Sequence, residues 1–185
     1  MPVFEKSTLL QQLQQDVNDI ISRTHVLSAA DPVLLNRQPA PDAWSVAQVW
    51  AHLNFYNDIY LPRLEEKIKA TNGTGHAFKT GWLGNYFTEM MAPKVEGVPV
   101  NKMSAPPNAR PEAALDAPQV IETFLAGEQH LLRLLEQAAH ANLDSRVRTG
   151  ISSLIRLKVG DTLRFLIAHQ QRHLLQAERT LLQVQ

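Results

Sequence analysis

Two histidines of this chain have a spacing that suits metal binding. They are His169 and His173, at the two ends of the segment His169-Gln170-Gln171-Arg172-His173. In an α-helix this spacing places both imidazoles on one face, one turn apart. Two imidazoles arranged in this way can chelate one divalent ion, with Zn–N distances of ~2.0–2.1 Å. The same spacing occurs by chance in helices, so the pair alone does not define a metal site.

A third histidine, His52, lies between Val49 and Tyr56 on the apolar side of another predicted helix. A lone histidine on an apolar face is more often a core residue than a ligand. Two inward histidines on one helix and a third on another, however, fit a metal site built from facing helices. We therefore take His52, His169 and His173 as candidate ligands. A plain helical protein whose histidines are structural stays open as the alternative.

The composition limits the chemistry that is left. The chain has 185 residues, no cysteine, and 18 lysine plus arginine residues against 18 aspartate plus glutamate residues. The absence of cysteine excludes a disulfide framework, a thiolate metal site and a cysteine nucleophile. Zero net charge argues against a general binder of nucleic acid, because such proteins rely on clustered lysine and arginine. Any metal site must therefore use histidine, aspartate or glutamate.

No stretch of the sequence suggests a membrane or a secreted protein. No apolar run approaches the ~18 residues that a membrane span needs. The first residues lack the basic start and apolar core of a signal peptide. We therefore expect a cytoplasmic protein with no membrane partner. The length is typical of one domain, for which ~100–200 residues is usual, so residues 1–185 are predicted to form a single domain.

The elements that must position the histidines are predicted to be four long helices. Apolar residues recur at three- and four-residue steps, the period of a helix with one buried face, over residues 4–29, 45–70, 118–142 and 161–183. Ser45 and Asp161 are the expected N-caps of the second and fourth helices. No alternating run predicts a strand. The long crossover, residues 71–117, carries several prolines and at most one short helix, near residues 81–87. The predicted fold is an all-α four-helix bundle with this crossover between its second and third helices.

Two motifs then resemble a known family. The segment from Trp44 to Leu53 begins with Trp-Ser and ends with His52-Leu53, and the fourth helix carries His169-x-x-x-His173-x-x-Gln176. Together, in this order, they resemble the DinB/YfiT-like metal-binding superfamily, in particular its DinB_2-type branch, over nearly the whole chain. The resemblance implies an up-down-down-up bundle, often a homodimer. It also implies a divalent metal, zinc first and nickel or iron as alternatives, with His52, His169 and His173 as its ligands.

The resemblance also implies a range of activities. Some relatives are transferases or isomerases that use low-molecular-weight thiols such as bacillithiol, mycothiol or glutathione, and others are described only as metal-dependent hydrolases. Three neutral imidazoles leave a coordination position open, as in catalytic sites. That position suits a water, whose pKa falls toward ~7, or a thiol, which a metal deprotonates. We expect an enzyme of one of these types acting on a small molecule. The alternative is a non-catalytic metal-binding bundle that serves as a sensor or interaction module.

Three further side chains are candidates for a role in catalysis. Gln176 lies one turn beyond His173 and can hydrogen-bond a ligand. Tyr56 lies one turn beyond His52 and can donate to a bound anion. Glu128 lies on the apolar stripe of the third helix, where a carboxylate needs a partner or a role as a base. For Glu128 the alternatives are a pairing with an arginine or a place at the edge of the stripe. The other histidines are predicted not to be ligands: His25, His76, His130 and His140.

Overall fold

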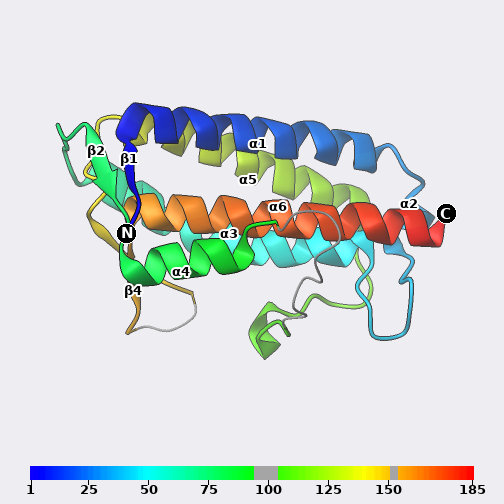
Figure 1. Ribbon diagram of the computed structural model, residues 1–185. Helices are drawn as coiled ribbons and strands as arrows, with labels where there is room; N and C mark the ends of the chain where they lie inside the picture. Colours follow the sequence, from blue (N-terminus) through cyan, green and yellow to red (C-terminus); the bar gives the residue numbers. More distant parts are fainter. Residues whose placement is uncertain (94–103, 151–153) are drawn as a thin grey trace.

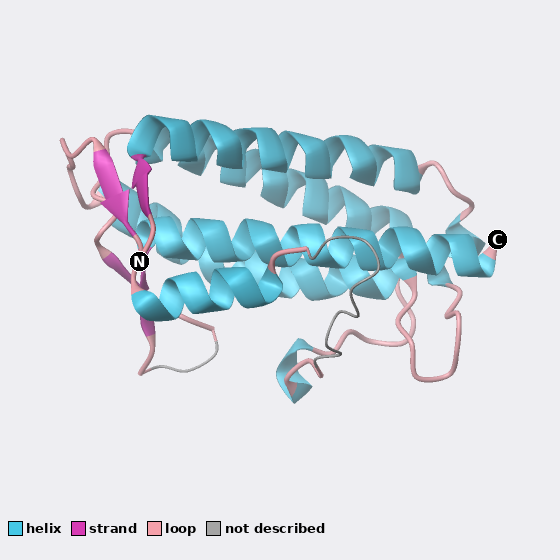
Figure 2. Cartoon of the chain, in the orientation of Figure 1, coloured by secondary structure: helices cyan, strands magenta, loops and turns pink. Residues whose placement is uncertain are grey.

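The computed structural model describes residues 1–93, 104–150 and 154–185, and these are mostly helical, as predicted (Figure 2). Part of the predicted crossover therefore lies outside the described residues. The α-helices are α1 Lys6–Ser28, α2 Pro32–Asn36, α3 Val46–Lys69, α4 Trp82–Met91, α5 Ala117–Ala138 and α6 Val159–Val184, and a short 3-10 turn, η1, spans Pro107–Ala109. None of the helices in the described ranges is long and apolar enough to cross a membrane.

The four long helices lie side by side (Figure 1). Helix α3 contacts both α5 and α6, and α1 contacts the same two helices. In Figure 1 the chain runs from left to right in α1 and α6, and from right to left in α3 and α5. Helix α4 packs along α6 on the outside of this group. The contact between α3 and α6 matters most for function, because these helices carry the three candidate ligands.

The apolar stripes predicted from the sequence form the core between these helices. Each long helix contributes side chains that are completely shielded from solvent, such as Ile20, Leu64, Leu134 and Leu166. Burying a side chain of this size stabilises the fold by ~1.5–3 kcal/mol. The packing of these stripes fixes which face of each helix points inward, and so it also directs the histidines that lie on those faces.

The predicted N-cap residue is confirmed for α3 and wrong for α6. Ser45 caps α3 as predicted, in a capping box in which its hydroxyl accepts from the Gln48 amide and the Gln48 side chain accepts in return. The prediction of Asp161 as the N-cap of α6 is wrong. Helix α6 begins at Val159, and Asp161 lies inside its first turn, where its carboxylate accepts a hydrogen bond of 2.8 Å from the Gly81 amide.

Four short strands were not predicted. Strand β1 (Val3–Glu5) pairs antiparallel with β2 (Ala77–Lys79), and β3 (Arg146–Arg148) pairs antiparallel with β4 (Arg156–Lys158). Each strand has three residues, which is too short for an alternating pattern to stand out. Both pairs lie at the end of the molecule where α1 and α6 begin (Figures 1 and 2). The first joins the segment before α1 to the connection between α3 and α4, and the second lies within the connection between α5 and α6.

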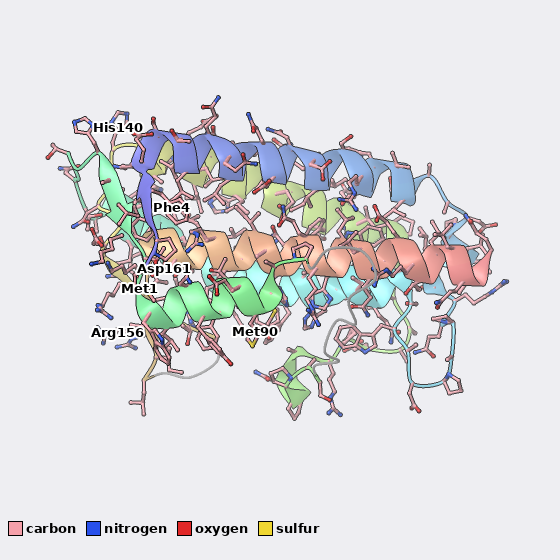
Figure 3. All side chains as sticks on the ribbon, in the orientation of Figure 1. Met1, Phe4, Met90, His140, Arg156 and Asp161 are labelled. Atoms are coloured by element: carbon pink, nitrogen blue, oxygen red, sulfur yellow. The ribbon has the colours of Figure 1, made fainter. Side chains whose placement is uncertain are left out.

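A close approach holds α4 against the start of α6. Gly84 of α4 has no side chain, and a Cβ atom built there would overlap the carboxyl group of Asp161. Asp161 is itself buried, at the strand-bearing end of the molecule (Figure 3). The Asp161 carboxylate accepts a hydrogen bond from the backbone amide of Gly81, the residue just before α4. The two helices are therefore joined by this hydrogen bond, by the Arg164 guanidinium, which donates to Asn85 Oδ1, and by a contact that only glycine allows.

We predict that Gly84→Ala destabilises the protein by about 1–3 kcal/mol, because the added methyl group must displace α4 or Asp161. Helix propensity alone predicts the opposite sign, since alanine is ~1 kcal/mol better than glycine inside a helix. Gly75→Ala, in the loop between α3 and β2, is the control for adding a methyl group where there is room, because the nearest atom to its Cβ is 3.9 Å away. Urea denaturation measures both variants. A Gly84→Ala protein as stable as the wild type would contradict the packing described here.

Candidate metal centre

The three candidate ligands come together between α3 and α6. One ring nitrogen from each of His52, His169 and His173 can be chosen so that the three lie within 4.8 Å of one another. The ring centroids are 5.3 Å apart for His52 and His169, 4.7 Å for His52 and His173, and 4.5 Å for His169 and His173. His52 and His169 are buried and His173 is half-buried. This cluster could hold a metal ion.

Hydrogen bonds fix two of the rings. His52 Nδ1 lies 2.8 Å from the carbonyl oxygen of Ala109, and His173 Nδ1 lies 2.8 Å from Oε1 of Gln176. A carbonyl or amide oxygen only accepts, so each imidazole donates through Nδ1. A neutral ring then carries its lone pair on Nε2. Metal-binding histidines are typically oriented in this way, by an oxygen acceptor on the other ring nitrogen.

The third ring has an unsatisfied atom. Nδ1 of His169 is buried and has no hydrogen-bond partner among the described residues. A buried polar atom left in this state costs ~1–3 kcal/mol. A set of three imidazoles with one orphaned nitrogen fits a divalent cation such as zinc, for which neutral imidazole is a preferred ligand. Nickel and iron accept imidazole as well, so the donor set suits any of these cations and does not select one element.

The surroundings keep the three imidazoles uncharged. Burial lowers the pKa of His169 well below its ordinary value, and the neighbouring His173 and His52 lower it further. Burial also lowers the pKa of His173, to about 3. For His52 burial again lowers the pKa, although the Ala109 carbonyl opposes this. Neutral rings at physiological pH have the free lone pairs that metal binding requires.

Aromatic rings surround the cluster. The ring of Trp44 lies 4.8 Å from that of His52, and the ring of Tyr56 lies 4.7 Å from that of His169. Phe165 stacks on His169 at 6.0 Å. Trp44 is half-buried, packs against the core, and also lies 6.3 Å from His173 between ring centroids. These rings exclude water from one side of the cluster and strengthen electrostatic interactions within it.

The other predicted site residues fall into two groups. Gln176 and Tyr56 adjoin the cluster, since Gln176 bonds to His173 and the Tyr56 ring contacts two of the histidines. Burial raises the pKa of Tyr56, which keeps its hydroxyl protonated. Glu128 is not one of the clustered residues. Both alternatives offered for it are wrong, because it is fully buried and bonds to the amides of Asn57 and Gln170 instead of to an arginine.

The remaining histidines lie apart from the cluster, in line with their predicted role as non-ligands. His25, His76 and His140 are exposed, and His140 lies at the strand-bearing end of the molecule (Figure 3). His130 Nε2 lies 3.3 Å from a carboxylate oxygen of Glu65. Sequence reasoning missed the Ala109 carbonyl, which orients His52 from the distant turn η1. A backbone oxygen carries no signal in the sequence.

The fold and the cluster define a helical protein with a histidine site that could hold a metal ion. The family model of the DinB superfamily matches residues 12–177. The chain therefore belongs to the DinB superfamily, which confirms the resemblance of its two motifs. A search of curated proteins finds no significant match, and a search of solved structures finds none.

We predict that zinc raises the unfolding temperature of the wild-type protein. An ion that binds only the folded state stabilises it by ~2.7 kcal/mol at a concentration 100 times its Kd. Replacing both His169 and His173 by alanine is expected to abolish the shift, whereas His130→Ala, outside the cluster, retains it. Thermal melts with zinc and with EDTA make the comparison. Equal melting temperatures of wild-type protein in zinc and in EDTA would support the structural interpretation of the histidines.

A second prediction concerns the orientation of His173. Gln176→Leu removes the acceptor of its Nδ1–H and should weaken zinc binding ~10–100-fold, as loss of such partners does in other metal sites. Gln183→Leu on the same helix is the control, because Gln183 is exposed. Competition with a chromophoric chelator measures both affinities. Unchanged affinity in Gln176→Leu would show that this hydrogen bond does not orient a ligand.

Proposed function

We propose that this protein is a divalent-metal-dependent enzyme acting on a small molecule. The reaction is transfer to or from a low-molecular-weight thiol, or else hydrolysis, on an up-down-down-up four-helix bundle. Zinc is the proposed metal, with nickel or iron as alternatives, and His52, His169 and His173 are the proposed ligands. When bound, such a cation lowers the pKa of a water or a thiol and polarises a substrate.

One observation carries the proposal. Two of the three imidazoles are held by oxygen acceptors at Nδ1, so that both have a lone pair at Nε2. The third, His169, adjoins both of them and is neutral at physiological pH. Three neutral nitrogen ligands leave one tetrahedral position without a protein ligand, and catalytic zinc sites have this composition. A site made for structure alone usually has four protein ligands.

The neighbouring side chains supply the remaining functions. The protonated hydroxyl of Tyr56 is the proposed donor to an anionic oxygen or sulfur of the substrate. Gln176 orients His173, and Trp44 and Phe165 keep water from one side of the cluster. The chain contains no cysteine, so any thiol in the reaction must belong to a substrate. Glu128 is not proposed as the base, because its carboxyl group is not one of the clustered residues and bonds to the amides of Asn57 and Gln170.

The second candidate function is a non-catalytic metal-binding protein, a sensor or interaction module. The burial of His52 and His169, at 3% and 4% exposure, favours it, because a substrate needs access to the metal. Half-buried His173 is the member of the cluster that solvent reaches. Access through this residue is what separates the two proposals. The homodimer implied by the resemblance stays a prediction, which the mass in solution tests.

Substitution by cobalt tests the open position. We expect glutathione or cysteine to change the visible spectrum of the cobalt protein and to add a thiolate-to-metal absorption band that saturates. The His52→Ala and His173→Ala proteins should lack the band. A spectrum insensitive to every thiol would contradict the transferase. Hydrolysis of an activated ester, lost in EDTA, would then support the hydrolase, and the lack of both responses would favour the non-catalytic protein.

A further inference from the structure

A single buried carboxyl group joins three of the four long helices. Glu128 of α5 is fully buried, and its Oε1 accepts hydrogen bonds from Asn57 Nδ2 of α3 at 3.1 Å and from Gln170 Nε2 of α6 at 2.6 Å. Gln170 Nε2 also donates to Asn57 Oδ1 at 3.1 Å. The three side chains form a closed polar network inside the apolar core.

This network adjoins the histidine cluster along both of the helices that carry it. Gln170 directly follows His169 on α6, and Asn57 lies five residues after His52 on α3, about one and a half helical turns away. The hydrogen bonds to Glu128 therefore fix α3 and α6 relative to each other along their axes, close to the turns that carry the histidines. A shift of one helix along the other would break these bonds and separate the histidines at the same time.

The approach of α5 to α3 at this level depends on Gly127. A Cβ atom at Gly127 would lie 2.8 Å from Nδ2 of Asn57, which is closer than such contacts allow. The residue before Glu128 therefore brings the helices close enough for the carboxyl group to reach Asn57. This contact is independent of the hydrogen bonds and leads to the same arrangement.

Two oxygens of the network have no partner among the described residues. They are Oε2 of Glu128 and Oε1 of Gln170, and both are buried. The neighbours that bond to Glu128, Asn57 and Gln170, are neutral amides, and burial raises the pKa of the carboxyl group to about 8. A protonated carboxyl has a hydroxyl donor, and the amide oxygen of Gln170 is the acceptor that lacks one.

We propose that Glu128 is a positioning residue, whose neutral carboxyl group forms a doubly hydrogen-bonded pair with the Gln170 amide. Together with Asn57, this pair holds α3 and α6 in the register that brings His52, His169 and His173 together. The protonated carboxyl donates through Oε2 and accepts through Oε1, while the amide of Gln170 does the reverse. Its effect on metal affinity rests on the proposed function, whereas the pair itself does not.

Two substitutions separate this role from general stability. Glu128→Gln keeps one donor and one acceptor, and is expected to bind zinc with wild-type affinity. Glu128→Leu removes both and should weaken zinc binding ~10–100-fold. Leu135→Ala, at another fully buried position of α5, is the control for lost stability and should retain the affinity. Chelator competition is run well below every unfolding temperature. Wild-type affinity in Glu128→Leu, or weak binding in Glu128→Gln, overturns the proposal.

Two measurements on the metal-free protein test the pair by itself. The carboxyl pKa is raised from 4.5 to about 8 in the folded state. Its neutral form therefore contributes stability in full below pH 4.5, and this is lost as the pH rises through about 8. We expect wild-type protein to lose stability relative to Glu128→Gln between pH 6 and pH 9 on this account. The infrared band of a protonated buried carboxyl should be present at pH 6 and absent from Glu128→Gln.

The outcomes distinguish failure of the carboxyl–amide pair from failure of the proposed metal-dependent function. If wild-type protein fails to bind zinc but shows the infrared band and the loss of stability with pH, then the proposed function fails and the pair is supported. If the band is missing at pH 6, the carboxyl is ionised and the pair is wrong, whatever the zinc affinity. Should Glu128→Leu fail to fold, the Glu128→Gln measurements still decide the matter.

Discussion

The rest of the structure depends on keeping three imidazoles uncharged and close together between two packed helices. His52 and His169 are buried and His173 is half-buried, and this burial lowers the pKa of all three rings. Neutral rings do not repel one another and have lone pairs, but each needs a partner for its N–H. The Ala109 carbonyl and Gln176 supply two such partners, whereas His169 Nδ1 has none among the described residues. A buried imidazole nitrogen without a hydrogen-bond partner is free to bind a cation when it carries the lone pair of the ring, so the cluster could hold a metal ion.

The core also contains polar side chains, and these are tolerated because they hydrogen-bond to one another. Glu128, Asn57 and Gln170 would be costly among leucines if they did not satisfy one another. Their network joins α3, α5 and α6 next to the cluster. In the first turn of α6, the Asp161 carboxylate accepts a hydrogen bond from the Gly81 amide and so holds α4 in place. Both buried carboxyl groups therefore act on α6, the helix that carries two of the three histidines.

Much of this arrangement could be predicted from the sequence, and what could not has physical reasons. Apolar periodicity over three or more turns predicted helices close to the observed ones. The four-residue spacing predicted that His169 and His173 share one helix face, and the structure groups them with His52 of α3. The three-residue strands are too short to show a pattern. The Ala109 carbonyl is a backbone atom, and the partners of Glu128 depend on the register between helices. Neither the backbone carbonyl nor the register between helices can be read from the amino-acid sequence.

The central claim is that one divalent cation is bound by these three histidines. Elemental analysis of protein purified without an affinity tag tests it most directly, on the wild type and on a variant with His52, His169 and His173 all replaced by alanine. The account predicts about one equivalent of zinc, nickel or iron per chain in the wild type, retained on dialysis, and none in the variant. A wild-type protein that takes up no such metal, even when it is supplied, or a variant that holds as much, would contradict it.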